Sequence, residues 1–152
     1  MILKGFVIFT ISFYIFSFFL SFTDFKKFLV PNNLIITMSL MLLIFGFFES
    51  KIYISSIVLS LFILIFFILI MLINRRFIIG GGDIKYMMIV GLYLGLSSFA
   101  LFLIITGLLQ TITLLYIQNV NKRKIAPMVP VMFLSVILTE ILIKYNFYTI
   151  KF

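Results

Sequence analysis

The sequence predicts an all-α protein that crosses a membrane about six times. Of its 152 residues, 64% are hydrophobic and only 11% are charged, whereas about 25% charged is usual in a soluble domain. The apolar residues also form long runs, and a transmembrane helix needs about 20 residues, with roughly 17–25 the usual range. We therefore expect a single membrane-embedded domain over residues 1–152.

The helices are expected where these apolar runs lie. The first run, Gly5 to Phe22, exceeds the roughly 7–15 residues of a signal peptide's apolar region and no clear cleavage site follows, so we interpret it as a retained helix. Pro31 disfavours helical conformation at Val30 and suits a helix start, so a break precedes the second helix. The expected helices span about residues 3–23, 33–48, 52–73, 84–96, 98–118 and 126–145.

The basic residues indicate the orientation. Cytoplasmic loops of membrane proteins are enriched in Lys and Arg, and alternate loops here carry eight basic residues on one side and four on the other. We expect the richer side to be cytoplasmic and both termini to lie outside. This topology explains the net charge of +8 better than nucleic-acid binding does. Attraction of the basic residues to anionic lipid headgroups would be a secondary effect. The eight are Lys26, Lys27, Arg75, Arg76, Lys85, Lys122, Arg123 and Lys124, and the four are Lys4, Lys51, Lys144 and Lys151.

Cysteine and histidine are both absent from the sequence. Their absence excludes disulfides and thiolate chemistry and argues against a zinc site, so we expect neither a metal nor a cofactor. Acid–base chemistry would then depend on tyrosine, lysine or the four acidic residues. These are Asp24, Glu49, Asp83 and Glu140.

The two aspartates stand at the edges of apolar runs. Asp24 ends the first expected helix and Asp83 begins the fourth. The chain crosses the membrane twice between them, so both should lie on the same face whichever way the protein is inserted. An ionisable residue in a membrane span is costly and is by default a functional candidate, although Asp83 alone could simply cap its helix.

Three glycines precede the second aspartate. Gly80, Gly81 and Gly82 permit unusual backbone conformations and weaken a helix by about 1 kcal/mol each, so we expect an unwound segment before Asp83. Irregular backbone within a membrane is tolerated where it is buried in protein or lines a water-filled cavity. Two carboxylates about 3 Å apart share a proton, so one can activate water while the other protonates a carbonyl oxygen. The aspartate pair therefore suits hydrolysis of a peptide bond.

Three stretches resemble the prepilin peptidases, membrane-embedded aspartic proteases of type IV pilin and archaeal flagellin systems. Asp24 is followed seven residues later by Pro31 and Asn32, as in the family's aspartate-then-(Ile/Val)-Pro-Asn element. Residues 80–85, Gly-Gly-Gly-Asp-Ile-Lys, fit its Gly-x-Gly-Asp-x-Lys signature. Residues 125–130, Ile-Ala-Pro-Met-Val-Pro, are similar to its Pro-Phe-Gly-Pro element but lack the Phe-Gly between the prolines.

The resemblance implies that Asp24 and Asp83 are the catalytic residues in water on the cytoplasmic side, with Lys85 a candidate for substrate contact. The glycine run and the Pro31–Asn32 element would shape the loops around them. The resemblance also implies a single cut between the basic leader and the apolar helix of a pilin-like or flagellin-like precursor. Larger members carry an N-terminal region with Cys-x-x-Cys motifs linked to N-methylation. This chain begins directly at its first helix and has no cysteine, so we expect peptidase activity without methyltransferase activity.

Other functions remain open from the sequence. A small proton-coupled transporter or channel subunit could use the same carboxylates as a relay, although we find no internal repeat of the kind common in transporters. A non-catalytic assembly protein would leave the glycines beside Asp83 unexplained, and a presenilin-like protease would need a Pro-Ala-Leu motif, which is absent. A homodimer is compatible with the sequence, and which aspartate acts as the base is left open.

Two further spacings predict structural contacts. Gly91 and Gly95 form a Gly-x-x-x-Gly pattern, which permits close packing between helices. Glu140 and Lys144 are four residues apart near the outer end of the last helix, which predicts a local ion pair.

Overall fold

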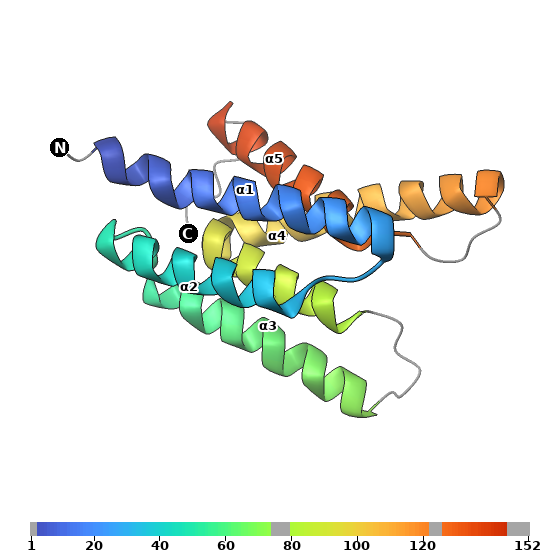
Figure 1. Cartoon of the computed structure of the whole chain (residues 1–152), viewed down its shortest axis with the longest axis horizontal. Helices are drawn as coiled ribbons and strands as arrows, with labels where there is room; N and C mark the ends of the chain where they lie inside the picture. The colour runs from blue at the N-terminus through green and yellow to red at the C-terminus, as the bar shows by residue number, and fades with distance from the viewer. Residues whose placement is uncertain (1–2, 74–79, 122–125, 146–152) are drawn as a thin grey trace.

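The regular elements of the chain are all helices. The computed structural model describes residues 3–73, 80–121 and 126–145, and within these ranges the predicted all-α class is confirmed (Figure 1). The predicted cytoplasmic residues Arg75, Arg76 and 122–124, and the first residue of the 125–130 element, lie outside the described residues. The helices are α1 (Leu3–Lys27), α2 (Asn32–Phe48), α3 (Ile54–Ile73), α4 (Gly81–Asn121) and α5 (Met128–Lys144).

The longest helix, α4, contains a sharp reversal at Gly95. This residue has φ 72° and ψ 175°, in the region that only glycine adopts readily. Figure 1 shows the part of α4 before this point running in one direction and the part after it returning toward the same end. The predicted helices 84–96 and 98–118 are therefore the two arms of α4, joined at Gly95 without an intervening loop.

The two glycines of the Gly-x-x-x-Gly pattern have different roles. A Cβ on Gly91 would lie 2.8 Å from Cδ1 of Ile63, so Gly91 allows close packing of α4 on α3, as predicted. Gly95 is needed for the reversal, since its φ is unfavourable for a residue with a side chain. Gly95 also lies close to α3, because an added Cβ would lie 3.3 Å from Oγ of Ser56, so the reversal is a role additional to the predicted packing.

Among the described residues, three helices are long and apolar enough to cross a membrane: α1 over Ile8–Lys27, α3 over Ile54–Ile73, and α4 over Gly81–Asn119. With α4 divided at Gly95, successive helical segments alternate in direction along the bundle (Figure 1). The shorter α2 has 17 residues and would extend about 26 Å. The count of six crossings stays a prediction.

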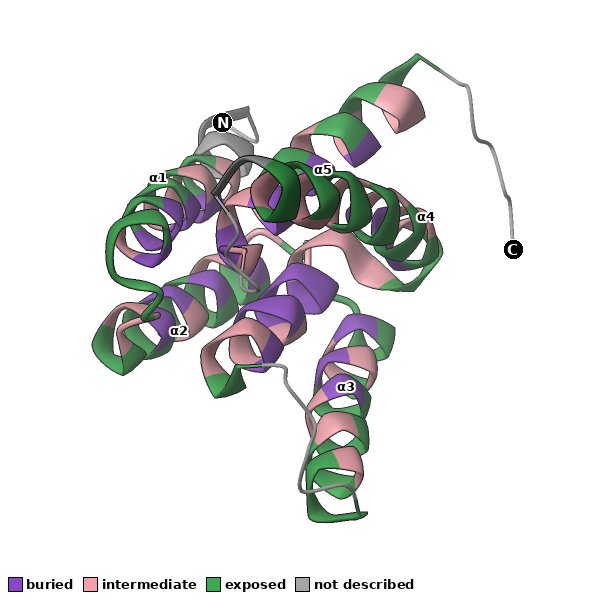
Figure 2. Ribbon diagram, turned by 90° about the vertical axis from the view of Figure 1, so that its right-hand side faces the viewer, coloured by how far each residue is buried: buried purple, intermediate pink, exposed green. Residues whose placement is uncertain are grey.

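The outward faces of the helices are apolar. Figure 2 shows the buried residues on the helix faces turned toward the middle of the bundle, with exposed residues outside. Phe48 and Ile73 are more than four-fifths exposed, which would be unfavourable in water and is expected against lipid. The first arm of α4 contributes most densely to the core, which also contains Phe13, Leu20, Met38, Leu42, Phe102, Met132 and Val136.

Candidate active site

Asp24 lies in the last turn of α1, where its side chain is only 4% exposed. The helix ends as Phe28 adopts a left-handed conformation with φ 51° and donates its N–H to the carbonyl of Asp24 at 2.8 Å. Pro31 is extended, with φ −66° and ψ 123°, and α2 begins at Asn32. The predicted break at Pro31 is confirmed, and it fixes the C-terminal end of α1 beside the start of α2.

Asp83 lies in the first turn of α4. Its N–H donates to the carbonyl of Gly80 at 3.0 Å, and its carboxyl group folds back over the same residue, because a Cβ on Gly80 would lie 2.9 Å from Oδ2 of Asp83. The side chain is partly buried. The absence of a side chain on Gly80 therefore leaves room for the Asp83 carboxyl group.

The glycine run is more helical than the sequence predicts. Gly81 and Gly82 form the first turn of α4 and only Gly80 precedes it, so the predicted unwound segment was wrong for these two residues. A Cβ on Gly82 would lie 2.6 Å from the Cβ of Val30. Glycine is needed here for close approach between α4 and the loop before α2, and this packing outweighs its low helix propensity.

The two aspartates meet at the same end of the bundle. Their carboxyl groups lie close enough for their charges to interact, although 58 residues separate them in the sequence. The contact between Gly82 and Val30 brings the ends of their helices together. Nearby, Nζ of Lys85 donates to Oδ1 of Asn32 at 2.9 Å, which ties α4 to α2.

The start of α5 completes the surroundings of Asp24. The N–H of Val129 donates to Oδ2 of Asp24 at 3.1 Å, and the N–H of Met128 lies beside the same carboxyl group. The residue before α5 is Pro127, which gives no side-chain cap, so Asp24 fills that role from another helix. Little in the sequence indicates this contact, because the donor is a main-chain N–H; the resemblance of residues 125–130 is the available signal.

A second polar cluster lies at the opposite end of the same three helices. The Glu140 carboxyl group accepts hydrogen bonds from the hydroxyls of Tyr14 and of Tyr93, the latter at 2.6 Å. The sequence predicted a local partner, Lys144, whereas these donors come from α1 and α4. Each cluster member lies ten or eleven residues along its helix from the aspartate site, or about 15 Å at 1.5 Å per residue.

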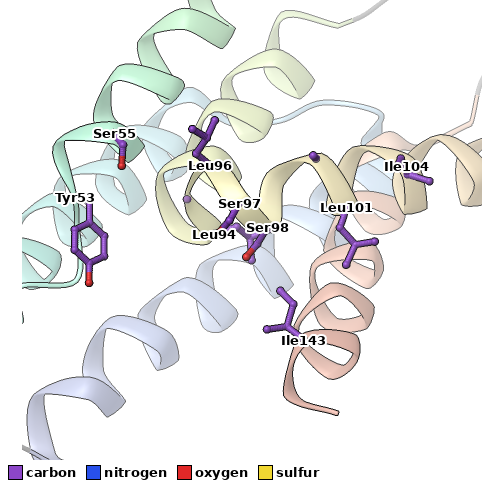
Figure 3. Close-up of a pocket in the computed structure, with 11 residues that line it drawn as sticks. Tyr53, Ser55, Leu94, Leu96, Ser97, Ser98, Leu101, Ile104 and Ile143 are labelled. Atoms are coloured by element: carbon purple, nitrogen blue, oxygen red, sulfur yellow. The ribbon is translucent and has the colours of Figure 1, made fainter. Parts of the chain in front are cut away.

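Two cavities also lie away from the aspartates. One of about 800 Å³ lies between the start of α3, the reversal in α4 and the end of α5, where Tyr53, Ser55 and Ile143 face α4 (Figure 3). Another of about 590 Å³ is lined by Glu140, Tyr93 and other residues of that end. Neither of these two cavities is lined by Asp24 or Asp83.

The described residues contain no group of three or more His, Cys, Asp or Glu side chains that could hold a metal ion. The chemical groups assembled at the aspartate end are two carboxyl groups, main-chain N–H groups of α5, and the Lys85–Asn32 pair. The two carboxyl groups can hold and transfer protons, and the N–H groups can orient them.

The fold and site define a helical membrane protein with paired carboxyl groups at the junction of distant helices. A family model described as the type IV leader peptidase family matches residues 11–115, a range that contains both aspartates and the Pro31–Asn32 element. The chain therefore belongs to the type IV leader peptidase family. The comparisons with curated proteins and with solved structures found no match.

Proposed function

We propose that the protein is a membrane aspartic endopeptidase that removes the basic leader from a type IV pilin-like or flagellin-like precursor. The observation that carries this proposal is that Asp24 and Asp83 lie at the same end of the bundle, where Gly82 and Val30 hold the ends of their helices together and the two charges interact. Membership of the type IV leader peptidase family supports peptidase chemistry.

The paired carboxyl groups account for hydrolysis without a cofactor. With one proton between Asp24 and Asp83, the ionised group takes a proton from water as the water oxygen bonds to the peptide carbonyl carbon. The protonated group gives its proton to the carbonyl oxygen. When the tetrahedral intermediate collapses, the C–N bond breaks and the departing nitrogen takes the proton that one carboxyl group received from water. The other carboxyl group takes a proton from a hydroxyl of the intermediate, so the pair again holds one proton. The net reaction consumes one water molecule.

The surrounding contacts support this chemistry by fixing geometry. The N–H of Val129 orients the Asp24 carboxyl group, and Gly80 leaves room for that of Asp83. A displacement of about 1 Å in such a pair can lower the rate by about 100-fold. Helix packing at this end is therefore part of the catalytic arrangement.

We also propose six membrane crossings with the aspartates on the cytoplasmic side. The alternating directions of α1, α2, α3, the two arms of α4, and α5 support this topology (Figure 1). The distribution of Lys and Arg supports the orientation. A basic leader in the cytoplasm would then reach the aspartate end while the apolar helix of the precursor stays in lipid.

The direct test is co-expression with a precursor that has a basic leader before an apolar helix. Asp24→Asn and Asp83→Asn should each lower cleavage by at least about 1,000-fold, since a carboxyl group that transfers protons is lost. The new N-terminus is read by mass spectrometry, and membrane levels are measured in parallel. Glu49→Gln makes the same chemical change outside the site and should cleave normally. Normal cleavage by either aspartate variant would overturn the proposal.

A second candidate is a proton-coupled transporter or channel subunit that uses the same carboxylates as a relay. This candidate is favoured by buried hydroxyl groups between the two polar clusters, because a proton relay needs polar groups along its path. They belong to Ser17, Ser21 and Tyr86. Reconstituted protein would then carry a proton flux that depends on Asp24 and Asp83, with no proteolysis. Cleavage of a purified precursor in the absence of such a flux would exclude this alternative.

A further inference from the structure

One face of α1 carries polar side chains over its second half, from Tyr14 in the middle of the helix to Asp24 in its last turn. Tyr14, Ser17, Ser21 and Asp24 are spaced by three, four and three residues, which places them on one side of a helix. The last three are buried, with exposed fractions of 0%, 9% and 4%. This stripe joins the Glu140 cluster, which contains Tyr14, to the aspartate pair.

The first arm of α4 carries a similar stripe. Asp83, Tyr86 and Tyr93 share one side of this helix by the same spacing rule, and Tyr86 is fully buried. Over the described residues the backbones of α1 and α4 make little close contact. Aromatic side chains span the gap instead, as in the stacking of Phe13 on Tyr93 with ring centroids 3.8 Å apart. The two stripes therefore form one internal seam.

The hydroxyl groups in the middle of this seam make no hydrogen bond of good geometry to another protein group. Ser17 Oγ, Ser21 Oγ and the Tyr86 hydroxyl are buried without a hydrogen bond. The Tyr86 hydroxyl lies near Ser17, but the two do not have hydrogen-bond geometry. Elsewhere, Ser135 and Thr139 donate to the carbonyl four residues earlier in their helix, which is the usual solution for a hydroxyl within a helix.

Ordered water is the ligand that suits these groups. Buried polar groups nearly always have a partner, and internal water molecules typically bridge groups that lack one within the protein. Along α1 the steps from Tyr14 to Ser17, Ser21 and Asp24 are about 4.5, 6 and 4.5 Å at 1.5 Å per residue. Two hydrogen bonds of about 2.8 Å through one water molecule reach at most about 5.6 Å, which covers the two shorter steps. The step of about 6 Å requires two water molecules.

We propose that Ser17, Ser21 and Tyr86 bind a file of water molecules between the Glu140 cluster and the aspartate pair. The file gives the carboxyl groups a supply of water and a route for proton exchange from within the bundle. This catalytic role rests on the proposed peptidase function, whereas the binding of water does not. Tyr14 and Tyr93 connect the far end of the file to Glu140.

Hydroxyl-radical footprinting by X-ray radiolysis tests the file directly, because bound water generates radicals beside the side chains it contacts. With the protein in lipid nanodiscs, Tyr86 should be modified within about tenfold of the exposed Tyr53, although it has no exposed surface. Phe102 is equally buried and serves as the internal reference. If Tyr86 is as unreactive as Phe102, the water file does not exist.

Two variants locate the water within the seam. Ser17→Ala with Ser21→Ala should lower Tyr86 modification at least about fivefold, because the groups that hold the water are removed. Thr106→Val removes another buried, unpartnered hydroxyl from the second arm of α4 and should leave Tyr86 modification unchanged. An equal fall in both variants, or no fall in the double variant, contradicts the proposal.

Cleavage by the same double variant and by Asp83→Asn separates this inference from the proposed function. If the water file supplies the active site, kcat of the double variant for precursor cleavage should fall by about fivefold with KM unchanged, since water supply acts on the chemical step. Cleavage that persists in Asp83→Asn would overturn the peptidase assignment while leaving the footprint intact. A negative footprint with a fully inactive Asp83→Asn would overturn the water file alone.

Discussion

The helices α1, α4 and α5 build a polar site at each end of the bundle, and the two sites differ in what satisfies their carboxyl groups. At the far end, each oxygen of Glu140 accepts a hydrogen bond from a tyrosine hydroxyl. At the other end, Asp24 accepts from a main-chain N–H, and the Asp83 carboxyl group lies over a glycine. The comparison indicates that tyrosines make Glu140 a structural tie between helices, while the aspartates keep oxygen atoms available for reaction.

The backbone differs between the two ends as well. The aspartate end is made of helix ends packed closely enough that only glycine fits at position 82. The far end contains the reversal at Gly95 and cavities of about 800 and 590 Å³ (Figure 3). The helices are therefore tightly packed beside the two aspartates, whereas cavities lie beside Glu140 and its tyrosines. Substitutions at the two ends should then separate activity from stability.

The largest effect is expected at the glycine between the helix ends. Gly82→Ala places a Cβ 2.6 Å from that of Val30, so the start of α4 must move away from the loop. Displacement of Asp83 by about 1 Å should lower cleavage by about 100-fold, and overpacking should cost about 1–3 kcal/mol of stability. Cleavage of a purified precursor and thermal unfolding in detergent measure the two effects.

A neighbouring glycine provides the control for this change. A Cβ on Gly81 meets nothing within 4 Å, so Gly81→Ala should keep its activity and gain about 0.5–1 kcal/mol from improved helix propensity. Val30→Gly should partly restore cleavage in the Gly82→Ala protein, since it removes the clashing atoms. If both alanine variants lose activity equally, close approach at Gly82 is not what positions Asp83.

A glycine at the far end should affect stability more than cleavage. Gly95→Ala forces a residue with a side chain to adopt φ 72° and ψ 175°, a region essentially restricted to glycine, at a cost of about 1–3 kcal/mol. The expected result is a lower unfolding midpoint with cleavage retained at temperatures well below it. Gly107→Ala is the control, because this glycine is helical and nothing lies within 4 Å of its added Cβ. Loss of cleavage without loss of stability would mean that the reversal is coupled to the active site.

The sequence predicts the parts of this comparison that depend on composition and spacing. Long apolar runs predicted the helical class and the bounds of α2 and α3 to within two residues, and Pro31 predicted the break before α2. An even number of crossings predicted that Asp24 and Asp83 share one end, and the structure places them together. Their catalytic role stays a prediction.

The sequence does not predict contacts made by the main chain or by distant residues. The first helix continues to Lys27 instead of ending near residue 23, since basic side chains are favourable in the last turn. The donor to Asp24 is an N–H that any residue at position 129 other than proline could supply. Glu140 is held by tyrosines 126 and 47 residues away instead of by its neighbour Lys144.

The tyrosine tie can be examined by removing one hydroxyl. Tyr93→Phe keeps the ring that stacks on Phe13 but loses the 2.6 Å hydrogen bond to Glu140. A hydrogen bond to an acidic side chain contributes about 1.5–3 kcal/mol, so the unfolding midpoint should fall. Tyr14→Phe should do the same, and the double variant should lose less than the sum, because both tyrosines bind one carboxyl group. Strict additivity would show that Glu140 does not couple α1 to α4.

The smallest effect is expected from the polar pair that links α4 to α2 beside the aspartates. Lys85→Met keeps the length of the side chain but removes the donor to Asn32, and an exposed bond of this kind contributes about 0.5–1.5 kcal/mol. If Lys85 acts only through Asn32, then Asn32→Ala and Lys85→Met should each lower cleavage severalfold, and the double variant should be no worse than either. If Lys85 also contacts the precursor, Lys85→Met should raise KM further in the Asn32→Ala background. If Lys85 only positions α4 through Asn32, KM should be unchanged in that background. The measurement therefore decides whether Lys85 positions the helix or contacts the precursor.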